Sequence, residues 1–287
     1  MRPEDTRAQI LYGEDNIMAY LITSRKNEII KQASKLCSSA DYRREQALYI
    51  TEGARLCCDA ALSSVKIKIL FYTSKAMEKY GKYIDVIKEK AEQIYEIESH
   101  IAPMLSETKS PQGIFCMCKM ENYEHNLPDI QRNSHYIALE NIQDPANLGG
   151  ILRTAEALGV GGVILTNHCC DIYSPKVLRA SMGAIFRLPF YIQTDTVQTI
   201  EKLNKLGFTT LAAVPDSEAD KITEVNFNRP TVIIVGNEGN GLNIETIKVC
   251  SKSVTIPMLG RAESLNASAS AAILMWEMMR KKSGGVL

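Results

Sequence analysis

The sequence has no long hydrophobic run. No stretch approaches the ~18 consecutive apolar residues of a membrane-spanning helix, and no apolar segment follows the charges of the first ten residues, so we expect no secretory signal. The formal net charge is +0, from 33 basic and 33 acidic residues. Global charge therefore gives no reason to expect a polyanionic partner. These absences favour a cytoplasmic protein that is not bound to a membrane.

Cysteine is present, but not in metal-binding patterns. There are eight cysteines, none in a C-x-x-C pair and none near a histidine pair at zinc-ligand spacing. Several lie in apolar runs, as in GIFCMCKM over residues 113–120. We expect buried, reduced cysteines that act as small hydrophobic residues, and no metal site.

The usual nucleotide-binding loops are missing as well. Gly236 and Gly241 have the G-x-x-x-x-G spacing of a phosphate loop, but Leu242 and Asn243 follow where such a loop needs Lys and Ser or Thr. G-x-G-x-x-G is also absent. The loop offers backbone groups and one carboxylate, Glu238, so it favours a ligand that carries little negative charge. A glycine-rich turn without a ligand is the alternative.

The length of 287 residues and a hydrophobic content of 45% suit two globular domains. We expect an extension over residues 1–20, an α/β domain over 21–120, a polar linker over 121–133 and a second α/β domain over 134–287. In the second domain, helical segments alternate with short, continuous apolar runs. Such runs are typical of strands buried on both faces of a parallel sheet. The runs occupy 135–141, 161–167, 209–215, 230–237 and 253–259.

The first helix expected in the second domain carries an arginine in an unusual place. Asn147 is a candidate cap for a helix over residues 147–159, and Arg153 then falls within its first two turns. A positive charge near a helix N-terminus opposes the helix dipole, so the position suggests a function. A surface arginine paired with Glu156 or Asp144 is the structural alternative.

The segment ESLNASASAAILMWEMM, residues 263–279, starts with small polar residues and alanines and continues as a strongly apolar helix. The later methionines and Trp276 are typical of a core or an interface. The run of small residues indicates that something packs closely against the start of this helix.

Three motifs follow one another along residues 136–280. They are Asn147-x-Gly149-x-x-x-Arg153, Gly236-Asn237-Glu238-Gly239-x-Gly241, and Ile256-Pro257-Met258 followed by Glu263-Ser264-Leu265-Asn266-x-Ser268. These motifs resemble those of the SpoU (TrmH-type) RNA methyltransferases of the knotted SPOUT class, and Ala267 departs from them where the family usually has valine. The region before residue 120 resembles the family's ribosomal-protein-like substrate-binding domain, though less specifically.

The resemblance implies a parallel-sheet catalytic domain whose C-terminal segment is threaded into a deep trefoil knot, a device otherwise nearly absent from proteins. It also implies S-adenosylmethionine as the cofactor and a homodimer formed through the knotted domain. The cofactor-binding residues would be Gly236, Asn237, Glu238, Gly241, Ile256, Met258, Leu265 and Asn266. The catalytic residues would be Arg153, Asn147, Glu238, Ser264 and Asn266.

The implied reaction is attack of an RNA ribose 2′-hydroxyl on the cofactor's methyl group. A guanidinium has a pKa above ~12 and accepts no hydrogen bond. We therefore expect Arg153 to grip a phosphate and to stabilise charge on the 2′-oxygen, while the other catalytic candidates orient it or the ribose. Ribosomal RNA is the expected substrate. A tRNA methyltransferase and a non-catalytic RNA-binding factor are the alternatives.

The first domain is expected to bind the RNA. Residues 21–68 hold nine basic and five acidic residues, an excess that a solvated helix face explains equally well. The candidate RNA contacts are Arg25, Lys26, Arg43, Arg44 and Arg55.

Overall fold

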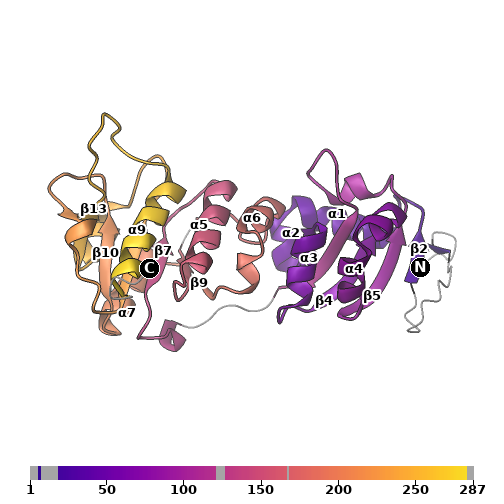
Figure 1. Ribbon diagram of the computed structural model, residues 1–287, viewed down its shortest axis with the longest axis horizontal. Helices are drawn as coiled ribbons and strands as arrows, with labels where there is room; N and C mark the ends of the chain where they lie inside the picture. Colours follow the sequence, from indigo (N-terminus) through magenta and orange to yellow (C-terminus); the bar gives the residue numbers. More distant parts are fainter. Residues whose placement is uncertain (1–5, 8–18, 121–126, 167, 283–287) are drawn as a thin grey trace. The chain divides into compact units, whose positions relative to one another are not determined.

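The computed structural model describes residues 6–7, 19–120, 127–166 and 168–282. Most of the extension predicted over residues 1–20, and the first part of the predicted linker, lie outside the described residues. The chain divides into two compact units (Figure 1). The first comprises Met1–Glu121 together with Tyr173–Phe186, and the second Asn122–Ile172 together with Arg187–Leu287.

The first unit is built on a mixed six-stranded sheet with the order β1-β2-β5-β4-β6-β3. Strands β2, β5 and β4 run parallel, whereas β6 pairs antiparallel with both β4 and β3. The elements are β1 (Thr6–Arg7), β2 (Ala19–Ile22), α1 (Glu28–Ser38), α2 (Ala40–Gln46), β3 (Leu48–Glu52), α3 (Ala54–Ala61), β4 (Ile67–Tyr72), α4 (Ser74–Lys88), β5 (Ala91–Ile97), η2 (Ala102–Leu105), β6 (Ile114–Lys119), α6 (Pro175–Ser181) and η4 (Ala184–Phe186).

Two details concern the N-terminal part of the first unit. Asn27 caps helix α1 and accepts a hydrogen bond from the Ile29 amide at 2.9 Å. Residues 19–20 form the start of β2 and pair with β5, so they belong to the sheet rather than to an extension. Buried aliphatic and aromatic side chains from α1, β3, β5 and β6 make the core, among them Ile30, Leu36 and Phe115.

Helix α6 belongs to the first unit although it comes late in the sequence. Arg179 on this helix pairs with Glu52 at 3.4 Å and Glu107 at 3.1 Å. The rings of Tyr173 and Tyr49 lie 4.7 Å apart between their centroids. These contacts explain why Tyr173–Phe186, predicted within the second domain, is grouped with the first unit.

The second unit is a parallel seven-stranded sheet with the order β11-β13-β10-β12-β7-β8-β9, as predicted in its parallel character. Its elements are η3 (Leu127–Asp129), β7 (Tyr136–Leu139), α5 (Pro145–Ala157), β8 (Val163–Leu165), β9 (Phe190–Ile192), α7 (Thr196–Lys205), β10 (Thr209–Ala213), β11 (Asp220–Lys221), η5 (Ile222–Glu224), β12 (Thr231–Val235), α8 (Ile244–Val249), β13 (Lys252–Thr255) and α9 (Ala267–Lys282).

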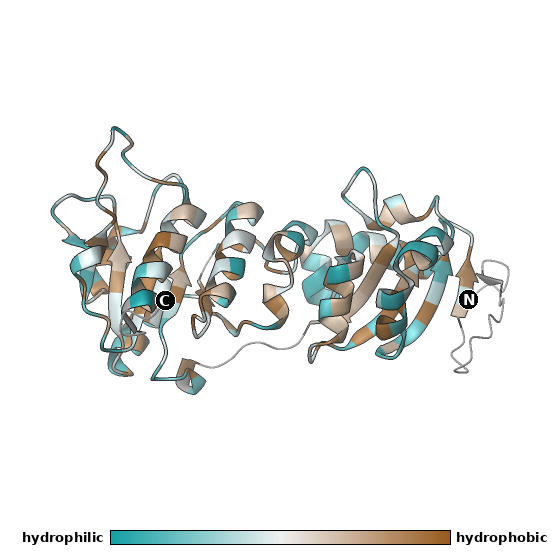
Figure 2. Cartoon of the chain, in the orientation of Figure 1, coloured by the Kyte–Doolittle hydropathy of each residue, from teal (hydrophilic) through white to brown (hydrophobic). Residues whose placement is uncertain are grey.

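The central strands of this sheet are apolar because helices cover both faces. Every residue of β7 and β12 is buried, as expected for strands in the middle of a parallel sheet. Figure 2 shows that the helices of this unit carry both hydrophilic and hydrophobic residues. The sheet thus forms a rigid base whose strand ends carry the candidate site.

Two features of the second unit were not predicted from the sequence. The edge strands β9 and β11 have only three and two residues, too few to show a periodic pattern of hydrophobic residues. The run over 253–259 forms a strand only as far as Thr255, and the residues after it leave the sheet. Threading of this segment into a trefoil knot stays a prediction.

None of the helices in the described ranges is long and apolar enough to span a membrane.

Candidate functional site

The carboxyl ends of β7 and β12 place two of the three motifs side by side. These strands are neighbours in the parallel sheet, so the segments after them emerge at the same edge, where open α/β sheets bind ligands. Residues 140–147 follow β7 and residues 236–243 follow β12. The third motif reaches this edge through the start of α9, which packs against α5.

A chain of side-chain hydrogen bonds joins all three motifs. The Asn147 Nδ2 donates to Glu238 Oε1 at 3.0 Å, and the Asn266 Nδ2 donates to Asn147 Oδ1 at 2.9 Å. Asn147 is buried, so both ends of its amide are used where water is largely excluded. Residues 147, 238 and 266 are far apart in sequence, and this chain shows that their motifs form one site.

Glu238 is held mainly by donors from Asn147 and from the segment just before it. Its carboxylate accepts hydrogen bonds from Asn147, from the Asp144 amide at 3.3 Å and from the Gln143 amide at 3.4 Å. Partial burial alone would raise the pKa of Glu238, but these hydrogen bonds outweigh burial and hold the pKa below its ordinary value. Glu238 is therefore an ionised anchor of the loop, whose oxygens are engaged by the protein itself.

The loop over residues 236–241 is closed by its own backbone. Asn237 and Gly241 exchange two backbone hydrogen bonds, at 3.0 and 2.9 Å. A Cβ at position 236 would lie 2.3 Å from the Gly241 carbonyl carbon, so only glycine fits there. Asn237 also donates from Nδ2 to the Asn141 carbonyl at 2.9 Å, which ties the loop to the end of β7.

The small residues of the C-terminal helix make room for α5. A Cβ at position 150 would meet the Ser268 Oγ at 2.6 Å, so Gly150 and the small residue Ser268 allow the two helices to approach closely. Asn266 caps α9 by accepting from the Ser268 amide at 2.9 Å. The prediction that Asn147 caps α5 is wrong. Asp144 is the cap and accepts from the Ala146 amide at 2.8 Å, which leaves Asn147 to link the motifs.

Arg153 lies exposed on α5, and its guanidinium has no hydrogen-bond or ion-pair partner among the described residues. The structural alternative, pairing with Glu156, does not hold because Glu156 pairs with Arg187 at 2.8 Å. Arg153 stands one turn after Gly150, on the adjoining part of the helix surface. It is therefore a free cation next to the α5–α9 contact.

The third motif is mostly exposed. Ser264, Leu265 and Met258 are all accessible, the last two with 37% of their surface exposed. Ile256 is half-buried at the end of β13. No described group contacts the Ser264 hydroxyl. This segment thus presents apolar and hydroxyl side chains beside the linked motifs.

Four of the five predicted RNA contacts are exposed. The side chains of Lys26 and Arg55 have no partner among the described residues, Arg25 donates to the His100 carbonyl at 2.9 Å, and Arg44 pairs with Asp41. Arg43 is buried.

The guanidinium of Arg43 donates to the carbonyls of Leu36 and Cys37 at the end of α1. Arg43 satisfies carbonyls that the helix end leaves without a partner. The prediction that it contacts RNA is therefore wrong.

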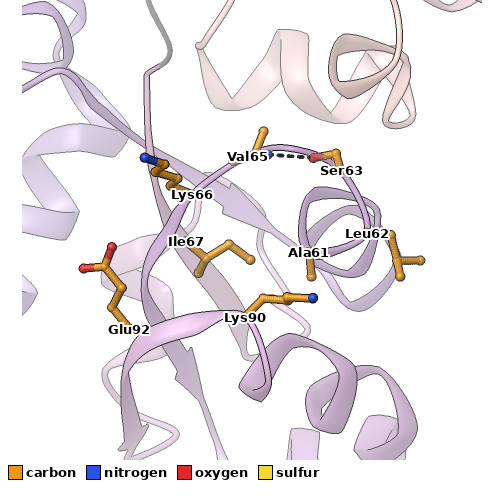
Figure 3. A pocket seen from close by; sticks show the side chains of 8 residues that line it. All are labelled: Ala61, Leu62, Ser63, Val65, Lys66, Ile67, Lys90 and Glu92. Atoms are coloured by element: carbon orange, nitrogen blue, oxygen red, sulfur yellow. Dashed lines mark hydrogen bonds between the residues drawn. The ribbon is translucent and has the colours of Figure 1, made fainter.

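An open pocket of about 540 Å³ lies within the first unit (Figure 3). Its apolar wall includes Ala61 and Ile67, and Lys66 and Lys90 are at its rim. Neither ammonium group has an ion-pair partner among the described residues, whereas Glu92 at the same rim is taken by Lys68 at 2.8 Å. None of the lining residues belongs to the three motifs.

Sequence reasoning missed the residues that fix the loops. Hydrogen bonds join the segment after β7 to the segment after β12. Thr246 donates to the Glu140 carboxylate, and Asn237 donates to the Asn141 carbonyl. The available signal for Glu140 was an acidic residue directly after an apolar run. Asn141 has a φ of 57°, which cannot be read from the sequence.

Comparison with known proteins assigns the chain to a family. The model of the SpoU rRNA Methylase family matches residues 134–276, and that of the MRM3-like substrate binding domain matches residues 27–116. An uncharacterized tRNA/rRNA methyltransferase of Synechocystis is 31% identical over 261 residues, which cover 91% of this chain and 94% of the relative. The chain therefore belongs to the SpoU rRNA methylase family.

Two further relatives extend over nearly the same length. The 23S rRNA (guanosine(2553)-2'-O)-methyltransferase RlmP of Bacillus subtilis is 27% identical, over 90% of this chain and 98% of the relative. The structure of an AdoMet-bound rRNA methyltransferase from Sinorhizobium meliloti has a TM-score of 0.78 at 26% identity, covering 91% of this chain and 97% of that one. The similarity thus includes both units.

Proposed function

We propose that the protein transfers a methyl group from S-adenosylmethionine to a ribose 2′-hydroxyl of ribosomal RNA. The observation that carries this proposal is the hydrogen-bonded chain Glu238–Asn147–Asn266, which gathers the three family motifs at one edge of the parallel sheet. The RNA substrate and the reaction follow the named relatives, one of which is a 23S rRNA 2'-O-methyltransferase.

The residues at this edge fit a cationic cofactor. The 236–241 loop contains no lysine, as suits a sulfonium rather than a triphosphate. Met258 and Leu265 offer exposed apolar surface for an adenine ring, and backbone groups near Gly236 and Ile256 offer hydrogen bonds. When bound, the cofactor supplies an electrophilic methyl group. Glu238, Asn147 and Asn266 hold the loops around it rather than contacting it, because their polar atoms bond to one another.

Arg153 is the proposed catalytic residue. In the reaction a bond forms between the 2′-oxygen and the methyl carbon, the sulfur–methyl bond breaks, and the hydroxyl proton passes to water or a phosphate. The free guanidinium of Arg153 can bind the adjacent RNA phosphate and stabilise the negative charge that grows on the 2′-oxygen. Ser264 is exposed, its hydroxyl has no hydrogen-bond partner in the described part of the chain, and it is proposed to orient the ribose.

The first unit is proposed to bind the RNA. Its exposed cations Arg25, Lys26, Arg44 and Arg55 can contact phosphates, and Lys66 and Lys90 add two further positive charges at the pocket rim. A ribose that is methylated must be accessible, so a loop or single-stranded segment is the expected target. Binding should weaken as salt rises, because phosphate contacts release counterions.

A second copy of the chain is the proposed partner of α9. Ile273 and Trp276 are 38% and 44% exposed and lie one turn apart on this helix, with Leu259 fully exposed in the preceding segment. Such an apolar stripe on a helix is typical of an interface. We therefore propose a homodimer formed through the second unit.

Labelled S-adenosylmethionine and total bacterial RNA provide the test. The expected result is label in 23S rRNA, at a ribose that becomes resistant to alkaline cleavage. Label in tRNA alone would support the tRNA alternative and contradict the ribosomal assignment. Cofactor and RNA binding without transfer would support the non-catalytic alternative.

A further inference from the structure

Glu140 is a buried carboxylate with no ion-pair partner among the described residues. It is 4% exposed and directly follows β7. A buried charge is costly unless hydrogen bonds satisfy it. Its carboxylate accepts three, from the Asn243 amide at 3.0 Å, the Asn243 Nδ2 at 3.2 Å and the Thr246 Oγ1 at 2.7 Å.

These bonds attach Glu140 to the segment that follows the 236–241 loop. Asn243 occupies the cap position of α8, but its own side chain does not cap the helix. The Asn243 amide is one of the donors that the start of a helix leaves without a partner inside the helix. Glu140, directly after β7, accepts its hydrogen bond instead. The start of α8 is thus fixed by a residue about 100 positions earlier in the chain.

The same residue also grips the segment before the loop. The Glu140 amide donates to the Val235 carbonyl at 2.9 Å, and Val235 immediately precedes Gly236. The backbone of Glu140 therefore holds one end of the loop and its side chain holds the other. Glu238 makes the converse contact, from the loop back to residues 143–147. Two carboxylates therefore clamp the loop, which means that both hold it to the end of β7 by hydrogen bonds: Glu140 lies after β7 and binds the segment after the loop, and Glu238 lies in the loop and binds the segment after β7.

We propose that Glu140 is a positioning residue that sets the shape of the cofactor loop over residues 236–243. The inference rests on the proposed function, because it takes this loop to be the place where S-adenosylmethionine binds. Glu140 acts through Asn243 and Thr246 and contacts neither substrate nor cofactor. Its loss should weaken cofactor binding and raise the KM for the cofactor, with little effect on the KM for RNA.

Two matched threonine variants test the clamp. Thr246 and Thr231 are both 1% exposed, and Thr231 bonds to the Arg229 carbonyl at the far end of β12. Thr246→Val removes a donor to Glu140, so the Kd for S-adenosylmethionine by calorimetry should rise about fivefold or more. Thr231→Val should leave it within about twofold. Equal losses in both variants would reduce the effect to general stability and overturn the proposal.

A swap of donor and acceptor provides a rescue. In Glu140→Gln an NH2 group replaces one of the two acceptor oxygens, so either the Asn243 amide or the Asn243 Nδ2 loses its acceptor, and cofactor affinity should fall. In Asn243→Asp two carboxylates face each other, and affinity should fall further. The double variant Glu140→Gln/Asn243→Asp restores a donor–acceptor pair and should recover most of the affinity. Failure to recover, with both single variants folded, would overturn the role of this contact.

Hydrogen exchange of the unaltered protein separates the two proposals. Protection of residues 236–243 by S-adenosylmethionine is expected. If the cofactor binds without protecting this segment, or does not bind, the proposed cofactor site fails and the role of Glu140 fails with it. If the segment is protected but Thr246→Val and Glu140→Gln bind the cofactor normally, only the inference about Glu140 fails.

Discussion

At the scale of single residues, a free cation and an engaged carboxylate have different roles in the candidate site. Arg153 has no hydrogen-bond or ion-pair partner among the described residues, whereas Glu238 accepts hydrogen bonds from Asn147 and from the Gln143 and Asp144 amides just before it. The guanidinium of Arg153 is available to bind substrate, whereas the carboxylate of Glu238 is occupied by hydrogen bonds that hold the loop in place. The two variants below follow from this contrast.

Arg153→Ala should lower kcat by ~10²–10³-fold, as expected when one charge-stabilising donor is lost. The Kd for S-adenosylmethionine should change by less than about twofold, because Arg153 is assigned to the RNA side. Arg229→Ala is the matched control, since Arg229 is also exposed and without a described side-chain partner, at the amino end of β12. Methyl-transfer kinetics and calorimetry measure both, and a large loss of cofactor affinity in Arg153→Ala would contradict the assignment.

Glu238 should make stability depend on pH. Because its folded pKa is depressed, the carboxylate stabilises the fold above the ordinary carboxyl pKa, and this contribution disappears as pH falls through the folded pKa. Glu238→Gln should therefore be less stable than the unaltered protein near neutral pH, and the difference should shrink in acid. Urea unfolding across this range measures it. A difference that stays constant with pH would argue against an ionised anchor.

At the scale of elements, the small-residue start of α9 was read from the sequence as evidence of close packing, and Gly150 against Ser268 explains it. The parallel sheet followed from its continuous apolar strands. The sequence could not assign Asn147, because a buried linking amide and a helix cap look alike without coordinates. It also could not show that Arg43 turns inward to the end of α1, since an arginine in a basic stretch suggests the surface.

Asn266 and Asn27 are both asparagine caps, of α9 and α1 respectively. Replacing either cap with alanine should cost about 1 kcal/mol of stability in its own unit. Only Asn266→Ala also breaks the bond to Asn147, so only this variant should weaken cofactor binding. Thermal unfolding and calorimetry on the pair decide the point. Equal cofactor affinities in the two variants would remove Asn266 from the site.

At the scale of the whole molecule, the exposed stripe on α9 predicts self-association. Trp276→Glu should convert a dimer to a monomer, because a buried unpaired charge at an interface is costly. Ile192→Glu is the control, with 46% exposure against 44% for Trp276, on the edge strand β9. Light scattering gives the mass. A monomeric unaltered protein would contradict the dimer, as would a Trp276→Glu variant that remains dimeric.

The central claim is that the three motifs form one site for a methyl donor. A crystal structure of the protein with S-adenosylmethionine tests it most directly. The account predicts cofactor density enclosed by the 236–241 loop, by Ile256–Met258 and by Ser264–Asn266, with Arg153 facing its methyl group. Density bound elsewhere on the chain, with these three segments empty, would contradict it.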